Sequence, residues 1–302
     1  MMNDDSIHVD NVRVDTVNFL SKFHTRLDVL RLDLVHPVIS GNKWFKLKEY
    51  LSDANAHHKK IIATFGGTYS NHIVATAAAA KQSGFKSLGI IRGERPAFLF
   101  FTLNDAVSFG MELYFISRED YKKKTIPHEI FDRYEKENIC LINEGGYGHR
   151  GMEGAKDILK QIDSSPYTHI ISAVGTGTTL AGLVEASSPD QKIIGISVLK
   201  NNYSLEEEIG KLISEKNKNR LMLIHNYHFG GYAKYQQKLI DFMNEWYENT
   251  GIPSDFVYTG KLFFAVYDLI EKKFFSPNNK VLIIHSGGLQ GNRSLPKGTL
   301  IF

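Results

Sequence analysis

The sequence predicts an α/β protein built on parallel sheets. Short β-rich runs alternate with helical patterns along most of the 302 residues. Several runs, such as residues 281–284, are apolar at consecutive positions, as expected of strands covered on both faces. The chain is 42% hydrophobic and 23% charged, which is ordinary for a globular protein and allows a large core. We therefore expect two lobes, each with an open, wound sheet.

The β-rich runs give the order of the elements. Residues 28–35 alternate through leucines 30, 32 and 34, which predicts an additional strand with one solvated face. Residues 61–80 contain no Asp, Glu, Lys or Arg and are long enough to span a bilayer. Glycines 66 and 67 interrupt that stretch, so we interpret it as a strand, a turn and a helix over 73–82. Seven further strands are predicted, at 60–65, 86–91, 112–117, 139–142, 168–174, 192–198 and 280–285.

Composition excludes several classes of protein. Lys and Arg total 36 against 33 Asp and Glu, and apart from residues 122–124 the basic residues are scattered, so no nucleic-acid surface is expected. Cys140 is the single cysteine, which excludes an internal disulfide and favours a reducing cytoplasm. The acidic N-terminus is unlike a secretory signal. His225 and His228 have no carboxylate or thiol partner in their segment, so we expect no metal site. We also expect no membrane partner, because Gly66 and Gly67 interrupt the uncharged stretch of residues 61–80.

Lys43 is the first candidate reactive group. It lies in the segment SGNKWFKLK, residues 40–48, where apolar residues at 44, 47, 51 and 54 have helical spacing. Ser40, Gly41 and Asn42 favour the start of that helix. The positive end of the helix dipole, together with any burial, disfavours the charged ammonium and exposes the neutral amine that Schiff-base chemistry needs. A solvated surface lysine is the alternative that this segment leaves open.

A Gly/Thr loop between a predicted strand and helix is a candidate phosphate site. Its glycines let backbone N–H groups converge, and the helix start adds positive potential. A dinucleotide fingerprint would need glycine where Leu180 stands and an acidic residue near 197–200, and the Walker lysine is missing. A phosphate of another kind, or a plain strand-to-helix turn, remains. The loop consists of Gly175, Thr176, Gly177, Thr178 and Thr179.

Three further segments place hydroxyl groups beside glycine. Residues 65–72, FGGTYSNH, lead into an alanine-rich helix, and Ser70 or Asn71 is suited to cap it. The same helix start could instead bind a substrate carboxylate, with Ser70 facing the reacting centre. Residues 255–261 and 285–288 are, taken alone, ordinary turns.

The segments SGNKWFKLK, FGGTYSNH, GTGTTLAG, VYTGK and HSGG, in this order, resemble one family. It is the pyridoxal-phosphate-dependent family of 1-aminocyclopropane-1-carboxylate deaminase and D-cysteine desulfhydrase. The resemblance implies the tryptophan-synthase β-subunit fold (fold type II), with two-lobed open twisted parallel sheets. On this basis we expect a large cofactor-binding domain of residues 1–45 and 145–302, a small α/β domain of residues 46–144, and a homodimer.

The resemblance also implies roles for individual residues. Lys43 matches the lysine that forms the Schiff base with pyridoxal 5'-phosphate, and Lys46 matches a lysine that helps to hold the phosphate. The loop from Gly175 to Thr179 matches the main phosphate cradle. Asn71 corresponds to the asparagine at the phenolic oxygen, and Ser70 to the serine beside the substrate carboxylate and Cα.

Two tyrosines and two hydroxyl residues bear on the substrate, a small amino acid. Tyr258 matches a tyrosine above the cofactor, and Tyr232 aligns with a second active-site tyrosine. Ring-opening deaminases have glutamate and leucine where this chain has Thr259 and Ser286, near the pyridine nitrogen. Hydroxyl groups stabilise a protonated pyridine less than a carboxylate does. The resemblance therefore favours β-elimination from D-cysteine, giving pyruvate, sulfide and ammonia.

Other functions stay open at this point. Tyr69 replaces the usual glutamine, Phe45 replaces a basic residue, and Trp44 enlarges the same segment, so another substrate is possible. The alternatives are 1-aminocyclopropane-1-carboxylate deamination, another lyase or synthase of the same fold type, and a non-catalytic protein that binds pyridoxal phosphate.

Overall fold

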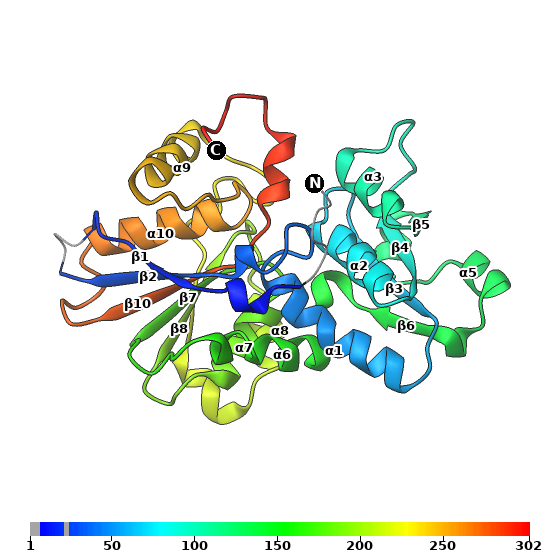
Figure 1. The fold of residues 1–302 in the computed structure, drawn as a ribbon, viewed down its shortest axis with the longest axis horizontal. Helices are drawn as coiled ribbons and strands as arrows, with labels where there is room; N and C mark the ends of the chain where they lie inside the picture. Colours follow the sequence, from blue (N-terminus) through cyan, green and yellow to red (C-terminus); the bar gives the residue numbers. More distant parts are fainter. Residues whose placement is uncertain (1–6, 21–23) are drawn as a thin grey trace. The chain divides into compact units, whose positions relative to one another are not determined.

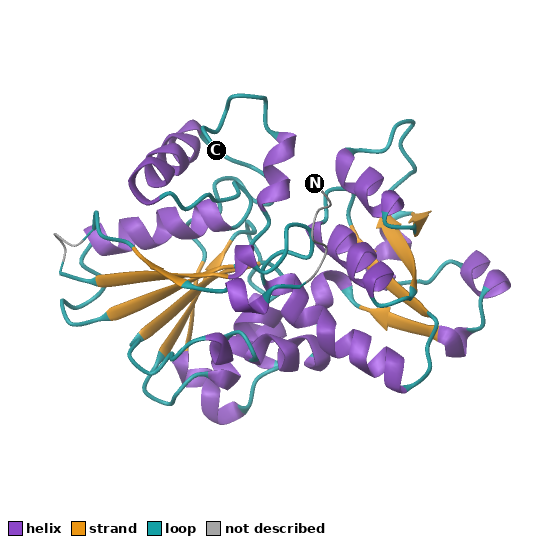
Figure 2. Cartoon of the chain, viewed as in Figure 1, coloured by secondary structure: helices purple, strands orange, loops and turns teal. Residues whose placement is uncertain are grey.

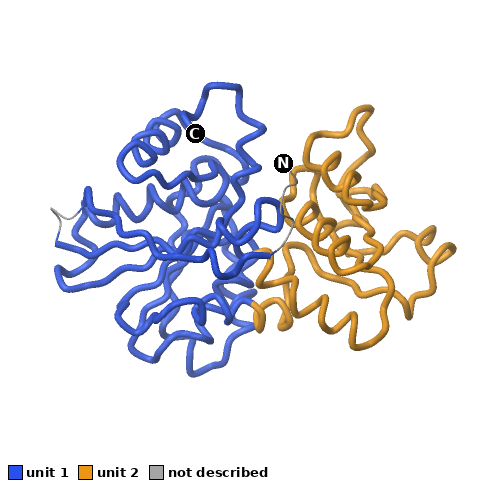
Figure 3. The backbone as a smooth tube through the Cα atoms, viewed as in Figure 1, with its two compact units in different colours: residues 1–42, 155–302 blue, residues 43–154 orange. Residues whose placement is uncertain are grey.

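A computed structural model describes residues 7–20 and 24–302. The chain forms two compact units (Figure 3): residues 1–42 with 155–302, and residues 43–154. It passes between them after Asn42 and after Gly154, whereas the sequence predicted crossings after residues 45 and 144. Those functional domain boundaries stay a prediction.

The first unit contains a six-stranded sheet (Figures 1 and 2) in the order β1-β2-β10-β7-β8-β9. Strand β1 pairs with β2 antiparallel, and every other pair is parallel. The carboxyl ends of five strands therefore lie at one edge, where α/β proteins place their ligands. The strands are β1 (Val14–Thr16), β2 (Arg26–Arg31), β7 (His169–Val174), β8 (Lys192–Ser197), β9 (Leu221–Ile224) and β10 (Lys280–His285).

Helices cover both faces of this sheet. Helix α10 packs on β7 and β8, and α9 packs on α10, so that Trp246, Phe263 and Val266 join Ile171 and Ile283 in one core. Helix α7 packs on the same strands and contacts α8. The helices are α6 (His149–Lys156), where the chain enters this unit, α7 (Thr178–Ala186), α8 (Leu205–Gly210), α9 (Gln237–Thr250) and α10 (Thr259–Glu271).

The second unit is a four-stranded parallel sheet in the order β5-β4-β3-β6. Helices α2 and α3 bury Ile73 and Leu103 against one face, while α4 and α5 bury Tyr121 and Ile130 against the other. Both faces are thus covered, which explains the continuous apolar strands. The elements are β3 (Ile61–Gly66), β4 (Lys86–Arg92), β5 (Met111–Ile116), β6 (Ile139–Ile142), α1 (Asn42–Ala56), α2 (Asn71–Gln82), α3 (Phe101–Ser108), α4 (Arg118–Lys123) and α5 (His128–Arg133).

The two parallel sheets confirm the predicted fold class. Seven predicted strands, β3 to β8 and β10, begin and end within two residues of their predicted limits, and residues 61–80 form a strand, a turn and a helix. The three- and four-residue strands β1 and β9 were not predicted from sequence. No helix among the described residues is both long and apolar enough to cross a membrane.

The prediction that residues 28–35 form a strand with one solvated face is wrong. Strand β2 ends at Arg31, a 3-10 helix (Leu32–Leu34) follows, and residues 27–31 are all buried. Asp28 is fully buried because Thr16, Arg26 and Tyr167 donate to its carboxylate at 2.7–2.9 Å. The alternation of leucines with polar residues in this segment therefore does not mark a solvated face. The polar side chains form a buried layer in which they are hydrogen-bonded to one another.

A second part of that layer joins β2 to β10. The Arg31 guanidinium donates to Asp33 at 2.7 Å and to Asp15 at 2.8 Å, and His285 Nδ1 lies 3.4 Å from Asp33. Burial alone would raise the pKa of Asp33, but His285 and then Arg31 outweigh it and lower that pKa. The ionised carboxylate is thus the form that the fold stabilises.

We expect Asp33→Asn to lower the free energy of unfolding at pH 7 by about 3 kcal/mol, because it leaves Arg31 in a broken buried pair. Since folding lowers the pKa of Asp33, its contribution is complete above the unfolded value of about 4 and is lost as the pH falls through the folded value. Urea unfolding at pH 7 and pH 3 measures both effects. The exposed pair of Asp132 with His128 provides the control, and an equal loss in Asp132→Asn would contradict the argument.

Candidate active site

The start of α1 is fixed by close backbone packing in the first unit. Gly41 has φ +65°, and a Cβ there would lie 2.0 Å from the carbonyl oxygen of Ser286. A Cβ on Gly287 would lie 2.4 Å from Ser40 Oγ, and the Asn42 N–H donates to Ser286 O at 3.3 Å. Only glycine fits at these two positions, and the first and last sequence motifs therefore pack directly together.

The same helix start is bound to the Gly/Thr loop. Asn42 Nδ2 donates to Thr179 Oγ1 at 2.7 Å, and both side chains are buried. Because this oxygen accepts the amide proton, its own hydrogen can be donated elsewhere. Lys43, the next residue, is half-buried and is the second residue of α1, as predicted.

The loop from Gly175 to Thr179 has the form of an anion site. Gly177, with φ +86°, precedes α7 and gives it no side-chain cap. A Cβ at Gly177 would lie 2.5 Å from Ile209, so the backbone is tightly enclosed. The first N–H groups of a helix have no acceptor within the helix, and they suit a phosphate. Thr178 and Thr179 are buried in the first turn beside these N–H groups.

Lys46 is a buried lysine one turn along α1 from Lys43. Its Nζ donates to the carbonyl oxygen of Gly145 at 2.5 Å. Burial, and then the charge of Lys43, lower its pKa well below the ordinary value. A bound anion would reverse this shift, because it favours the charged amine. The residue therefore fits the phosphate-holding role implied by the resemblance.

His72, in the first turn of α2, presents a buried acceptor. Thr64 Oγ1 donates to Ile142 O at 2.9 Å, so it must accept from His72 Nε2, also at 2.9 Å. That assigns the proton to Nε2 and leaves Nδ1 bare, and Nδ1 has no partner among the described residues. Burial, then Lys46 and Lys43, lower the pKa of His72 well below its ordinary value, so the ring is neutral.

Ser70 and Asn71 lie at the start of α2. The Ser70 side chain makes no capping hydrogen bond, although the residue occupies the capping position. Both residues are half-buried, and they follow the carboxyl end of β3. The uncapped helix start can thus receive a carboxylate, which is what the substrate would supply.

Tyr258 precedes α10, and its ring lies against the loop: a Cβ on Gly175 would be 3.3 Å from Tyr258 Cε1. The ring of Tyr232, which is 41% exposed, meets the ring of Tyr258 edge-on with 6.2 Å between centroids. The first unit therefore brings both tyrosines and the glycine loop together.

Asp255 is a buried residue that the sequence interpretation missed. Its carboxylate accepts the N–H groups of Val257, Tyr258 and Thr259 at 2.9–3.0 Å and the Thr259 hydroxyl at 2.8 Å. Burial raises the pKa of Asp255 even though these hydrogen bonds lower it. Asp255 lies three residues before Tyr258, the N-cap residue of α10, so the N-cap preference for aspartate does not identify it in the sequence. Thr259 uses its hydroxyl proton here, so its predicted role toward the cofactor is limited to accepting a hydrogen bond.

The predicted residues divide between the units. The first unit holds the loop from Gly175 to Thr179 together with Tyr232, Tyr258, Thr259 and Ser286, and the second holds Lys43, Lys46, Ser70 and Asn71. Their roles stay predictions. In the described part of the chain, no group of three His, Cys, Asp or Glu is placed to hold a metal ion.

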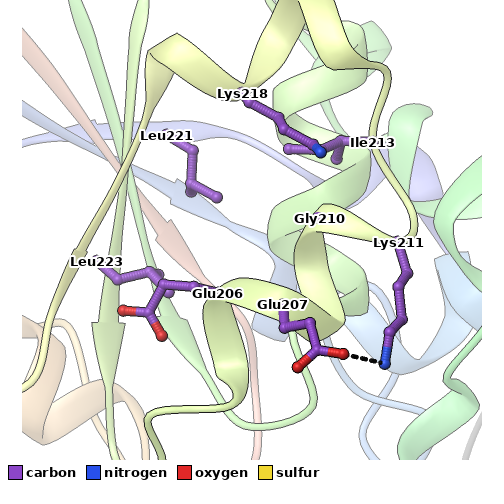
Figure 4. A pocket seen from close by; sticks show the side chains of 8 residues that line it. All are labelled: Glu206, Glu207, Gly210, Lys211, Ile213, Lys218, Leu221 and Leu223. Carbon is purple, nitrogen blue, oxygen red and sulfur yellow. Dashed lines mark ion pairs between the residues drawn. The ribbon is translucent and has the colours of Figure 1, made fainter.

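A pocket of about 420 Å³ in the first unit contains none of these residues (Figure 4). Lys211 is paired with Glu207 at 2.9 Å, as Figure 4 shows, and with Glu208 at 2.7 Å. Lys218 is paired with Glu215 at 2.6 Å. Its charged groups neutralise one another, so we assign no ligand to it. The lining residues are Glu206, Glu207, Gly210, Lys211, Ile213, Lys218, Leu221 and Leu223.

These observations fit pyridoxal phosphate. In the first unit, an uncapped helix start after a loop in which a Cβ would clash suits its phosphate. In the second unit, the half-buried amine of Lys43 suits its aldehyde, and the buried Lys46 side chain suits an anion.

We expect Gly41→Ala to destabilise the protein and to weaken retention of the cofactor. Gly251→Ala is the matched control, because Gly251 has φ +66° and nothing within 4 Å of its Cβ position. Left-handed strain costs about 1 kcal/mol in both variants, and the clash adds at least about 2 kcal/mol at Gly41. Denaturant unfolding with and without cofactor measures the difference. Equal losses would show that the packing against Ser286 can relax.

Comparison with known proteins supports the same assignment. A protein of Pyrococcus abyssi, described as a candidate 1-aminocyclopropane-1-carboxylate deaminase, is 29% identical over 87% of this chain and 84% of its own. The mitochondrial bifunctional D-cysteine desulfhydrase/1-aminocyclopropane-1-carboxylate deaminase of Arabidopsis thaliana is 29% identical over 88% of this chain and 73% of its own. A crystal structure of an ACC deaminase homologue superposes with a TM-score of 0.79 at 27% identity, covering 93% of this chain and 90% of that one.

The pyridoxal-phosphate dependent enzyme family matches residues 16–287. The match covers most of the chain, including the first four motifs, His285 to Gly287 of the fifth, and every predicted site residue. The chain therefore belongs to the pyridoxal-phosphate dependent enzymes, and it is a homologue of the ACC deaminases and D-cysteine desulfhydrase within them.

Proposed function

We propose that the protein is a lyase that eliminates sulfide from D-cysteine, giving pyruvate and ammonia. The observation that carries this proposal is the Thr259 hydroxyl, which donates to Asp255 at 2.8 Å. Neither this hydroxyl nor that of Ser286 is an ionised partner for a pyridine nitrogen. Expulsion of a thiolate needs a weaker electron sink than opening of a carbon ring, so the hydroxyl pair favours elimination.

The chain provides groups for holding the cofactor and the substrate. The loop before α7 and Lys46 would bind the phosphate, and Asn71 the phenolic oxygen. The start of α2 with Ser70 would bind the substrate carboxylate, because helix N-termini favour anions. We further propose that the enzyme works as a homodimer, on the basis of the resemblance alone.

Pyridoxal phosphate supplies the electron sink that makes a Cα proton removable. Lys43 Nζ would take that proton, acting as a general base after its amine is released. The electron pair of the broken Cα–H bond forms the Cα–Cβ double bond, and the Cβ–S bond breaks to release thiolate. Water then hydrolyses the released aminoacrylate to pyruvate and ammonia. Tyr258 would move a proton at the substrate, with Tyr232 beside it.

Deamination of 1-aminocyclopropane-1-carboxylate is the second candidate, because the relatives described above carry that description. It requires the same lysine and phosphate loop. The two candidates differ in the strength of the electron sink that they need.

With cofactor bound, we expect D-cysteine to yield pyruvate and sulfide at least about tenfold faster than 1-aminocyclopropane-1-carboxylate yields 2-oxobutanoate, a difference of about 1.4 kcal/mol in activation free energy. Coupled assays of 2-oxo acids and sulfide measure both rates. Lys43→Ala should remove the yellow absorption of the lysine-bound cofactor, while Lys48→Ala, a half-buried lysine on the same helix, should keep it. The reverse substrate ranking would defeat the argument from Thr259 and Ser286.

We expect Tyr258→Phe to lower kcat by about 10²–10⁴, as removal of a proton-transfer group does, with little change in cofactor affinity. Tyr267→Phe is the control on α10, because its hydroxyl donates to the exposed Glu271. Steady-state kinetics and titration with the cofactor separate the two effects. If affinity and kcat fell equally, Tyr258 would be a cofactor ligand instead.

A further inference from the structure

Lys261 is a buried charge that the proposed reaction does not use. The side chain is fully buried, one turn along α10 from Tyr258. Its Nζ donates to the carbonyl oxygen of Gly231 at 2.7 Å. Burial lowers the pKa of Lys261 to about 8, against the opposing charge of Asp255. An ammonium held by a backbone carbonyl instead of a paired carboxylate is costly to bury.

The carbonyl belongs to a turn with an unusual backbone. Phe229, Gly230, Gly231 and Ala233 have φ of +51°, +98°, +117° and +50°. Two of these residues carry side chains that disfavour the left-handed region, and such strain persists only where surrounding contacts enforce it. Within the turn, Lys234 N donates to Gly231 O at 3.2 Å. Lys261 adds a charged donor to the same oxygen from outside the turn.

The turn carries Tyr232, whose ring meets that of Tyr258. The start of α10 therefore contacts the turn twice, through the ring of its N-cap residue Tyr258 and through the Lys261 ammonium three residues later. We propose that Lys261 is a positioning residue: by holding the Gly231 carbonyl it keeps Tyr232 against Tyr258. The catalytic consequence rests on the proposed function, whereas the order of the turn does not.

The test compares Lys261→Met, which keeps length but loses the donor, with Lys261→Arg, which retains a charged donor. Lys59→Met is the matched control, because Lys59 Nζ donates to a backbone carbonyl, that of Glu137, at 2.6 Å on the surface. Amide hydrogen exchange of the cofactor-loaded protein is measured over residues 229–234. We expect Lys261→Met to speed exchange there by at least about tenfold, with α7 unchanged, and Lys261→Arg to restore part of the protection. Unchanged exchange would overturn the proposal.

A double-mutant cycle tests whether Lys261 acts through Tyr232. Lys261→Met should lower kcat by about 10–100-fold in the wild type and by less than about twofold in Tyr232→Ala, because coupled residues are not additive. KM and the cofactor absorption should hardly change. Equal losses of kcat in both backgrounds would overturn the coupling. Should Lys261→Met not fold, Lys261→Leu, which also lacks a donor, serves in its place. If D-cysteine proves not to be a substrate, hydrogen exchange alone decides the positioning role.

Discussion

The contact between Gly41 and the Ser286 carbonyl is the constraint on which the candidate site depends. With only 2.0 Å between that oxygen and a Cβ position, the chain after β2 and the chain after β10 must pass each other as glycine backbone. Asn42 then binds Thr179, so three segments separated by more than a hundred residues are fixed in one unit. Lys43 is the next residue along the chain, and its backbone position is determined by this packing rather than by its own helix.

Buried charged residues of this protein serve two different purposes. Asp28, Asp33 and Arg31 are paired with opposite or donating groups, and they stabilise the join between β2 and its neighbours. Lys46 and Lys261 each bind one backbone carbonyl and have lowered pKa values. Such lysines contribute little to stability, because desolvation outweighs a single neutral acceptor. A bound anion better explains why Lys46 is buried, and the strained turn at residues 229–234 better explains why Lys261 is buried.

Sequence patterns predicted the parts of the fold that depend on local physics. Consecutive apolar residues gave the parallel strands, and the Gly/Thr loop and Lys43 could be placed at helix starts from short-range preferences. The burial of Asp28 and the use of the Thr259 hydroxyl by Asp255 could not, because both depend on tertiary neighbours. Strand β9 is too short to give a periodic signal. The predicted site roles were inferred from resemblance, and only the positions of these residues follow from the fold.

The location of the motifs follows from parallel topology. The Gly/Thr loop follows β7, and Ser286 follows β10, which is its neighbour in the sheet, so both lie at one carboxyl edge. Ser70 and Asn71 follow β3 in the second unit in the same way. At such an edge, chain leaving each strand is free of ladder hydrogen bonds, and the next helix directs its unpaired N–H groups there. Substitutions at these edges can therefore change the substrate while leaving the sheets intact.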